Sequence, residues 1–88
     1  MLRIDLLKNS FPDLEFKKKR EHGIYVLNIS EDKLRERLKD YKCDEVPEVL
    51  VTSRTQKYRL SKKDVYMLRG SYYIIKTSRQ NELYLYEM

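Results

Sequence analysis

The chain has 88 residues, of which 41% are apolar and 38% are charged, and its formal net charge at pH 7 is +5. At this length folding buries only about 60% of the surface that the unfolded chain exposes, so we expect one domain, residues 1–88, with a modest core and no deep cleft. No apolar run approaches the roughly 20 residues that cross a bilayer, and the first residues lack a signal-peptide core. We therefore expect a cytoplasmic protein without membrane contact.

Side chains that carry chemistry are scarce. Cys43 is the only cysteine and His22 the only histidine, which excludes an internal disulfide and a multi-thiolate zinc site. A nucleophilic triad would need His22, which lies in a charged stretch typical of exposed turns. Acidic residues gather at 13–15 and 44–48, but no acid-x-acid or acid-x-lysine motif of a metal-dependent nuclease falls at the end of a predicted strand. We expect no cofactor, no metal site and no catalytic residue.

The amino end allows two interpretations. Apolar residues alternate from Leu2 to Leu6 as in a strand, yet Ile4, Leu7 and Phe11 match one face of a helix. We favour a short helix at 2–9, followed by a hairpin. Its strands would be residues 14–17 and 24–29, joined by a turn through residues 18–23.

A helix is predicted at 31–42. Ser30 is a good N-cap, acidic residues in the first turn suit the helix dipole, and Leu34, Leu38 and Tyr41 form one apolar stripe. Pro47 prevents much further extension.

The second half of the chain predicts two further hairpins around a short helix. Residues 49–52 and 57–60 would be strands joined by the polar turn 53–56, and residues 72–77 and 82–86 would be strands joined by the turn 78–81. Between these hairpins, Ser61 and Asp64 form a capping-box pattern and Gly70 suits a C-terminal cap, which predicts a helix at 62–69.

These elements predict an α+β protein of order α-ββ-α-ββ-α-ββ, a helix-hairpin unit occurring three times. A pseudo-threefold repeat is one interpretation, because Arg20, Arg54 and Arg79 then occupy equivalent hairpin tips; chance agreement among amphipathic hairpins is the other. We expect two layers, with helices on one face of a mainly antiparallel sheet. The predicted core is Leu34, Leu38, Leu50, Leu60, Val65, Leu68, Ile75, Leu83 and Leu85.

The excess positive charge favours a non-catalytic protein that binds nucleic acid, either DNA or RNA. Lysine and arginine neutralise phosphates, and tyrosine rings can stack on exposed bases. On the predicted strands Tyr25, Arg59 and Tyr84 would point away from the helices, while the remaining basic residues would cluster at hairpin ends. The candidate binding residues are Lys17, Lys18, Lys19, Arg20, Tyr25, Arg54, Lys57, Arg59, Arg79 and Tyr84.

Two other interpretations use the same residues. Residues 61–88 could form the helix and wing of a winged-helix DNA-binding variant, although no second helix precedes them. Tyrosine and arginine are also enriched at binding hot spots, which fits a protein-interaction module such as an accessory subunit or a viral inhibitor, acting in the host cytoplasm if viral. A homodimer would cover apolar sheet. The abundance of Lys, Arg and Glu beside only two Gly, two Pro and two Gln suggests a protein from a thermophile.

Overall fold

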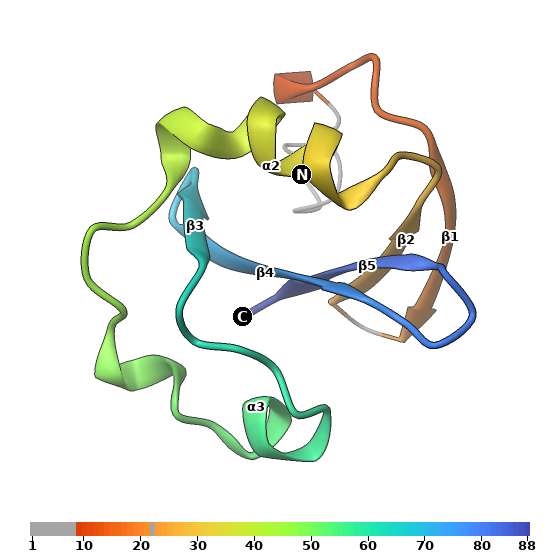
Figure 1. The fold of residues 1–88 in the computed structure, drawn as a ribbon. Helices are drawn as coiled ribbons and strands as arrows, with labels where there is room; N and C mark the ends of the chain where they lie inside the picture. Colours follow the sequence, from red (N-terminus) through yellow and green to blue (C-terminus); the bar gives the residue numbers. More distant parts are fainter. Residues whose placement is uncertain (1–8, 22) are drawn as a thin grey trace.

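The computed structural model describes residues 9–21 and 23–88, apart from the side chains of residues 18–21 and 49. The protein is α+β, with an open five-stranded antiparallel sheet, and two helices lie wholly within the described residues (Figure 1). The strands lie in the order β1-β2-β5-β4-β3, with bounds Phe16–Glu21 (β1), Ile24–Leu27 (β2), Val65–Leu68 (β3), Ser71–Thr77 (β4) and Leu83–Glu87 (β5). The helices are α2 (Glu31–Leu38) and α3 (Ser53–Lys57), and two 3-10 turns are η1 (Lys39–Tyr41) and η2 (Glu48–Leu50).

Both faces of the sheet are apolar. The pairing registers align residues of four strands into a transverse row on one face, namely Val65, Ile74, Tyr86 and Ile24. The neighbouring row, which faces the other side, consists of Ile75, Leu85 and Tyr25. Because consecutive strand residues point to opposite faces, a strand that is apolar at every position must be covered on both sides.

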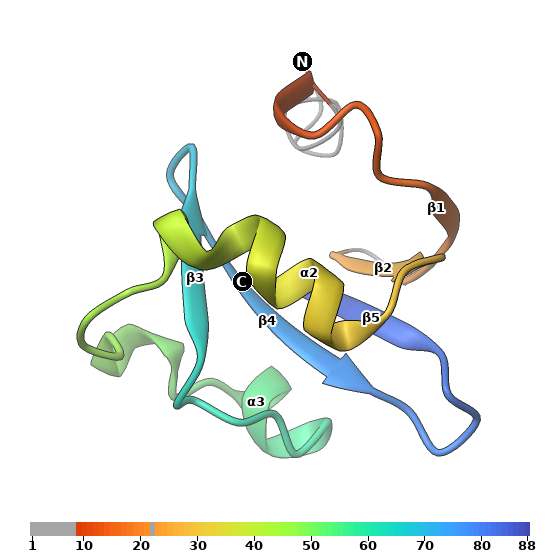
Figure 2. The same cartoon turned by 45° about the horizontal axis from the view of Figure 1, so that its top comes forward.

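Helix α2 covers one face, and we call the buried cluster beneath it the α2-side core. Leu34 and Leu38 of α2 pack there against sheet residues that include Tyr25 and Leu85. Phe11 and Leu14, which precede β1, complete the cluster. In Figure 2 the helix crosses in front of β4, in agreement with the contacts between these two elements.

The opposite face is covered by the segment that contains η2 and α3. Leu50 and Leu60, which flank α3, pack with Val65, Ile74 and Tyr86 in what we call the α3-side core. Figure 1 shows α2 and α3 on opposite sides of the sheet. All nine predicted core residues are buried. The expectation of helices on one face only is nevertheless wrong, because those nine residues divide between the two cores.

The predicted helix at 31–42 is confirmed. The Ser30 hydroxyl accepts a hydrogen bond from the Lys33 backbone N–H at 3.3 Å, and the acidic first turn lies at the positive end of the helix dipole. After Leu38 the chain tightens into the 3-10 turn η1, a common way for a helix to end.

The strands predicted at 49–52 and 57–60 are wrong. Residues 48–50 form the 3-10 turn η2 after Pro47, and residues 53–57 form α3 where a hairpin turn was expected. Thr52 and Thr55 provide the physical reason, since each side chain accepts a hydrogen bond from the other residue's backbone N–H and so caps the helix. The apparent alternation of Tyr58 and Leu60 belongs to the end of this helix.

The helix predicted at 62–69 is also wrong, because residues 65–68 form β3. Arg69 and Gly70 make the two-residue turn to β4, with positive φ angles of 50° and 84°, as the most favoured hairpin turns require. Asp64 does not cap a helix but forms ion pairs with Arg35 and Lys42. Sheet pairing therefore overrides the weak helical pattern, and the winged-helix interpretation loses its recognition helix.

The other two hairpins form, β1–β2 and β4–β5, the latter through residues 78–82. The turn predicted at residues 18–23 is nevertheless wrong, because β1 continues to Glu21 and pairs there with Ile24. The three arginines proposed as equivalent tips are not equivalent, since Arg54 lies in a helix, and the repeat order is not confirmed. The helix expected at 2–9 falls outside the described residues except for Asn9, which is helical. In the described part of the chain, no helix has the length and apolar character needed to cross a bilayer.

Candidate nucleic-acid interface

The tyrosines expected to stack on bases are buried. Tyr25 is 3% exposed in the α2-side core, and Tyr84 is 8% exposed in the α3-side core. The expectation that both point away from the helices fails because each face of the sheet carries a covering layer. Their rings pack against other aromatic rings, Tyr25 against Phe16 and Tyr84 against Tyr86. These two residues therefore build the core and present no stacking surface.

The basic residues of the hairpins do not gather at one place. Lys17, Lys18, Lys19 and Arg20 belong to β1, at the edge of the sheet, and Lys17 is exposed. Arg79 is exposed in the β4–β5 turn, which the registers place at the opposite end of the sheet from the β1–β2 turn. The side chains of Lys18, Lys19 and Arg20 lie outside those described.

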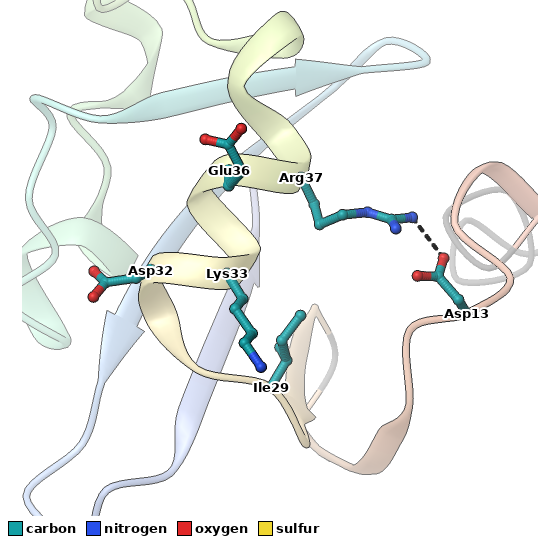
Figure 3. Close-up of a pocket in the computed structure, with 6 residues that line it drawn as sticks. All are labelled: Asp13, Ile29, Asp32, Lys33, Glu36 and Arg37. Atoms are coloured by element: carbon teal, nitrogen blue, oxygen red, sulfur yellow. Dashed lines mark hydrogen bonds and ion pairs between the residues drawn. The ribbon is translucent and has the colours of Figure 1, made fainter.

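Most cations of α2 and η1 are neutralised within the protein. Arg35, Arg37 and Lys39, and also Lys42 directly after η1, each form an ion pair with a carboxylate. Figure 3 shows Arg37 reaching across a shallow groove to Asp13, 2.5 Å away, which holds the segment before β1 against the helix. This groove is lined by three carboxylates and two cations, so it does not suit a polyanion.

Glu31 adds further side-chain hydrogen bonds to the ion pairs on α2. Its carboxylate accepts hydrogen bonds from the Thr77 hydroxyl at 2.7 Å and from Arg35 Nε at 3.2 Å. The bond from Thr77 is the largest influence on its pKa and, with Arg35, holds the pKa of Glu31 below its ordinary value despite partial burial. Helix α2 is thus joined to β4 by a carboxylate that remains ionised at neutral pH.

The segment after η2 differs from α2 because its charged residues are all basic. Residues 49–63 contain five basic residues and no acidic one. We call residues 54–63, which hold all five, the basic segment. Within the described part of the chain, Lys57, Arg59, Lys62 and Lys63 are exposed and form no ion pair with a carboxylate. Like charges this close in sequence repel one another, and a bound polyanion would relieve that repulsion.

Two further basic side chains fix the basic segment to the sheet. Arg54 donates a hydrogen bond from Nη1 to the Glu87 carbonyl oxygen at 3.1 Å, and Lys76 donates one from Nζ to the Tyr58 carbonyl oxygen at 2.6 Å. Gly23 leaves room for the arginine, because a Cβ there would lie 2.5 Å from Arg54 Nη1. Arg54, predicted as a binding residue, therefore has a positioning role.

The end of α3 places Arg59 in an unusual conformation. The Leu60 N–H donates to the Thr55 carbonyl at 2.9 Å and the Arg59 N–H to the Gln56 carbonyl at 3.3 Å, which is the Schellman pattern of a helix end. Arg59 occupies the position that usually holds glycine, and its φ is 53°. The helix end thus carries a strained, exposed arginine where glycine would fold more easily.

The structure brings three predicted binding residues together, Arg54, Lys57 and Arg59. The sequence interpretation missed Lys62 and Lys63, because it placed them in a helix after a strand. The signal that could have identified them is the absence of any acid between residues 49 and 63.

Buried polar groups have structural rather than chemical roles. The Tyr73 hydroxyl donates to Glu87 Oε2 at 2.9 Å in the interior, joining β4 to β5. Burial, followed by this bond, raises the pKa of Tyr73 far above its ordinary value, so the phenol stays protonated. Among the described side chains, no three of the types His, Cys, Asp and Glu lie close enough together to hold a metal ion.

Comparisons with protein-family models, with curated proteins and with solved structures find no match to this chain. Its function is therefore argued from its own residues.

Proposed function

We propose that the protein binds nucleic acid without catalysis, through the exposed cations of the basic segment. The observation that supports this most is a contrast between two surfaces of one small protein. The cations of α2 and η1 are mostly paired with carboxylates, whereas Lys57, Arg59, Lys62 and Lys63 pair with no carboxylate of residues 9–17 and 23–88. A row of uncompensated lysine and arginine side chains is what phosphate binding requires, because each contact releases condensed counterions.

The position of these cations supports the same function. Arg54 and Lys76 hold α3 and the following turn on the sheet through backbone carbonyls, so Lys57 and Arg59 project from a backbone that is anchored to the sheet. Lys57 lies over the ring of Tyr58, with Nζ 5.2 Å from the ring centroid, which further limits its movement. A braced set of cations loses less conformational entropy on binding than one on a loose loop.

The test compares two variants that each remove three lysine charges. The first variant carries Lys57→Gln, Lys62→Gln and Lys63→Gln in the basic segment. The control variant carries Lys33→Gln on α2, Lys39→Gln on η1 and Lys42→Gln directly after η1. Fluorescence anisotropy with labelled oligonucleotides of about 12 nucleotides would give the affinity at several salt concentrations between about 50 and 200 mM.

We expect the basic-segment variant to lose about two units of the slope of log K against log salt, since each phosphate contact on a single strand contributes about 0.7. The control should keep the wild-type slope, and circular dichroism should show that both variants fold. Equal losses in the two variants would mean that only net charge matters. Wild-type binding that does not weaken with salt would favour the protein-interaction hypothesis instead.

A further inference from the structure

A shallow pocket of about 360 Å³ lies beside the basic segment. Its lining residues are Val46, Pro47, Glu48, Val51, Lys62 and Lys63. One wall comes from the segment around η2, and the other comes from the two lysines that precede β3. Apolar surface and two ammonium groups therefore meet in one depression.

The wall around η2 is held in place by the backbone. The Leu50 N–H donates to the Pro47 carbonyl at 3.1 Å, and the Val51 N–H donates to the Glu48 carbonyl at 2.9 Å. Leu50 is 3% exposed in the α3-side core, while its neighbour Val51 is 52% exposed. The buried leucine thus fixes the turn, and the turn presents an apolar valine to solvent.

The charges of the pocket are mainly cationic. Lys62 and Lys63 form no ion pair in the described part of the chain, and the nearest acid in the sequence, Asp64, already pairs with Arg35 and Lys42. Glu48 is the one carboxylate among the lining residues. Its oxygens can accept a hydrogen bond from an exocyclic amino group, as carboxylates do with cytosine.

This combination matches one nucleotide of a single strand. The flat face of a base is apolar and can pack on aliphatic side chains, and the phosphates on either side of it need cations. In a duplex the bases are stacked and paired, so none is free to enter such a pocket. Tyr25 and Tyr84, which are buried, offer no stacking surface to a base.

We propose that the pocket formed by Val46, Pro47, Val51, Lys62 and Lys63 receives one unpaired base of a single-stranded nucleic acid, with the neighbouring phosphates bound by the two lysines. This inference rests on the proposed function and adds to it the class of ligand, single-stranded rather than double-stranded. Lysine acts here as a point charge on phosphate and carries no base specificity.

The experiment compares three probes of equal length by fluorescence anisotropy: a single-stranded oligonucleotide, the same backbone with abasic sites, and the corresponding duplex. We expect the single strand to bind most tightly. The variant Val51→Ser should weaken its binding about fivefold, at the lower end of what contact with one base contributes, and should leave the salt slope unchanged. Met67→Ser is the matched control, since Met67 is 48% exposed but lies outside the pocket.

The two proposals fail in different ways. If the abasic backbone and the duplex bind as tightly as the single strand, and Val51→Ser matches the wild type, the base pocket is refuted while phosphate binding by the basic segment stands. If no probe binds the wild type, the proposed function itself is wrong and the pocket falls with it. Thermal unfolding of both serine variants near the wild-type midpoint would show that the fold is intact.

Discussion

Replacing Arg59 with glycine should make the protein more stable and a weaker binder of nucleic acid. Arg59 has a φ of 53° at the end of α3, in the left-handed region that side chains other than glycine avoid. That conformation costs roughly 1–2 kcal/mol, and glycine removes the cost. Glycine also raises the conformational entropy of the unfolded chain, and this reduces the gain in the free energy of unfolding by about 0.4–1 kcal/mol. The free energy of unfolding should therefore rise by about 0.5–1 kcal/mol.

For a chain of this length, a change of 1 kcal/mol moves the midpoint of thermal unfolding by about 4–8 °C, so we expect a rise of about 2–8 °C. The same variant should lose about 0.7 units of the salt slope for a single-stranded oligonucleotide, because one phosphate contact is gone. Thermal unfolding followed by circular dichroism gives the first quantity, and anisotropy titrations at several salt concentrations give the second.

The matched control is Asn81→Gly in the β4–β5 turn, where φ is 60° and no charge is lost. It should gain less stability, because asparagine tolerates the left-handed region better, and it should bind as the wild type does. A lower midpoint for Arg59→Gly would refute the conformational argument. An unchanged salt slope would show that Arg59 does not contact phosphate.

Two further predictions concern the fold. Leu38→Ala, at a position 2% exposed in the α2-side core, should lower the free energy of unfolding by about 2–4 kcal/mol in denaturant titrations, because a cavity remains; a loss similar to that of the exposed control Lys39→Ala would contradict this. Glu31→Gln should destabilise the protein at neutral pH. Since the pKa of Glu31 is lower in the folded protein, its stabilisation is complete above the ordinary value of 4.5 and disappears as the pH falls through the folded value. A difference between Glu31→Gln and the wild type that stays constant from neutral to acidic pH would exclude the linkage.

The elements predicted correctly are those with strong local signals. Helix α2 has an N-cap, an acidic first turn and a regular apolar stripe, all within a dozen residues. The β4–β5 hairpin combines apolar strands with a short polar turn, and its register confirms it. The apolar strand β2 also signalled a hairpin with the segment before it, although β1 itself is mostly charged and runs to Glu21, four residues past the predicted end at residue 17. Burial of the predicted core follows equally directly, since large aliphatic side chains in a short chain have few alternatives to the interior.

The candidate site was only partly predictable. Lys57 and Arg59 were selected for their charge and for places on a hairpin that does not form, yet both are exposed in the basic segment. The tyrosines were assigned to the surface on the assumption that one face of the sheet would be open. That assumption concerns layers that lie far apart in the sequence, and no local pattern could correct it.

The sequence by itself determined the charge, the helix α2, two hairpins and the burial of the nine predicted core residues, because these depend on neighbours within a few residues. Only the tertiary structure decided the conformation of residues 48–68 and the face on which each tyrosine lies. Short segments there satisfy helical and extended patterns about equally well, and the choice between them is made by pairing and packing partners. The segment that covers the second face of the sheet buries Tyr84, whereas Tyr25 lies in the core beneath α2, and the cations of the basic segment remain exposed.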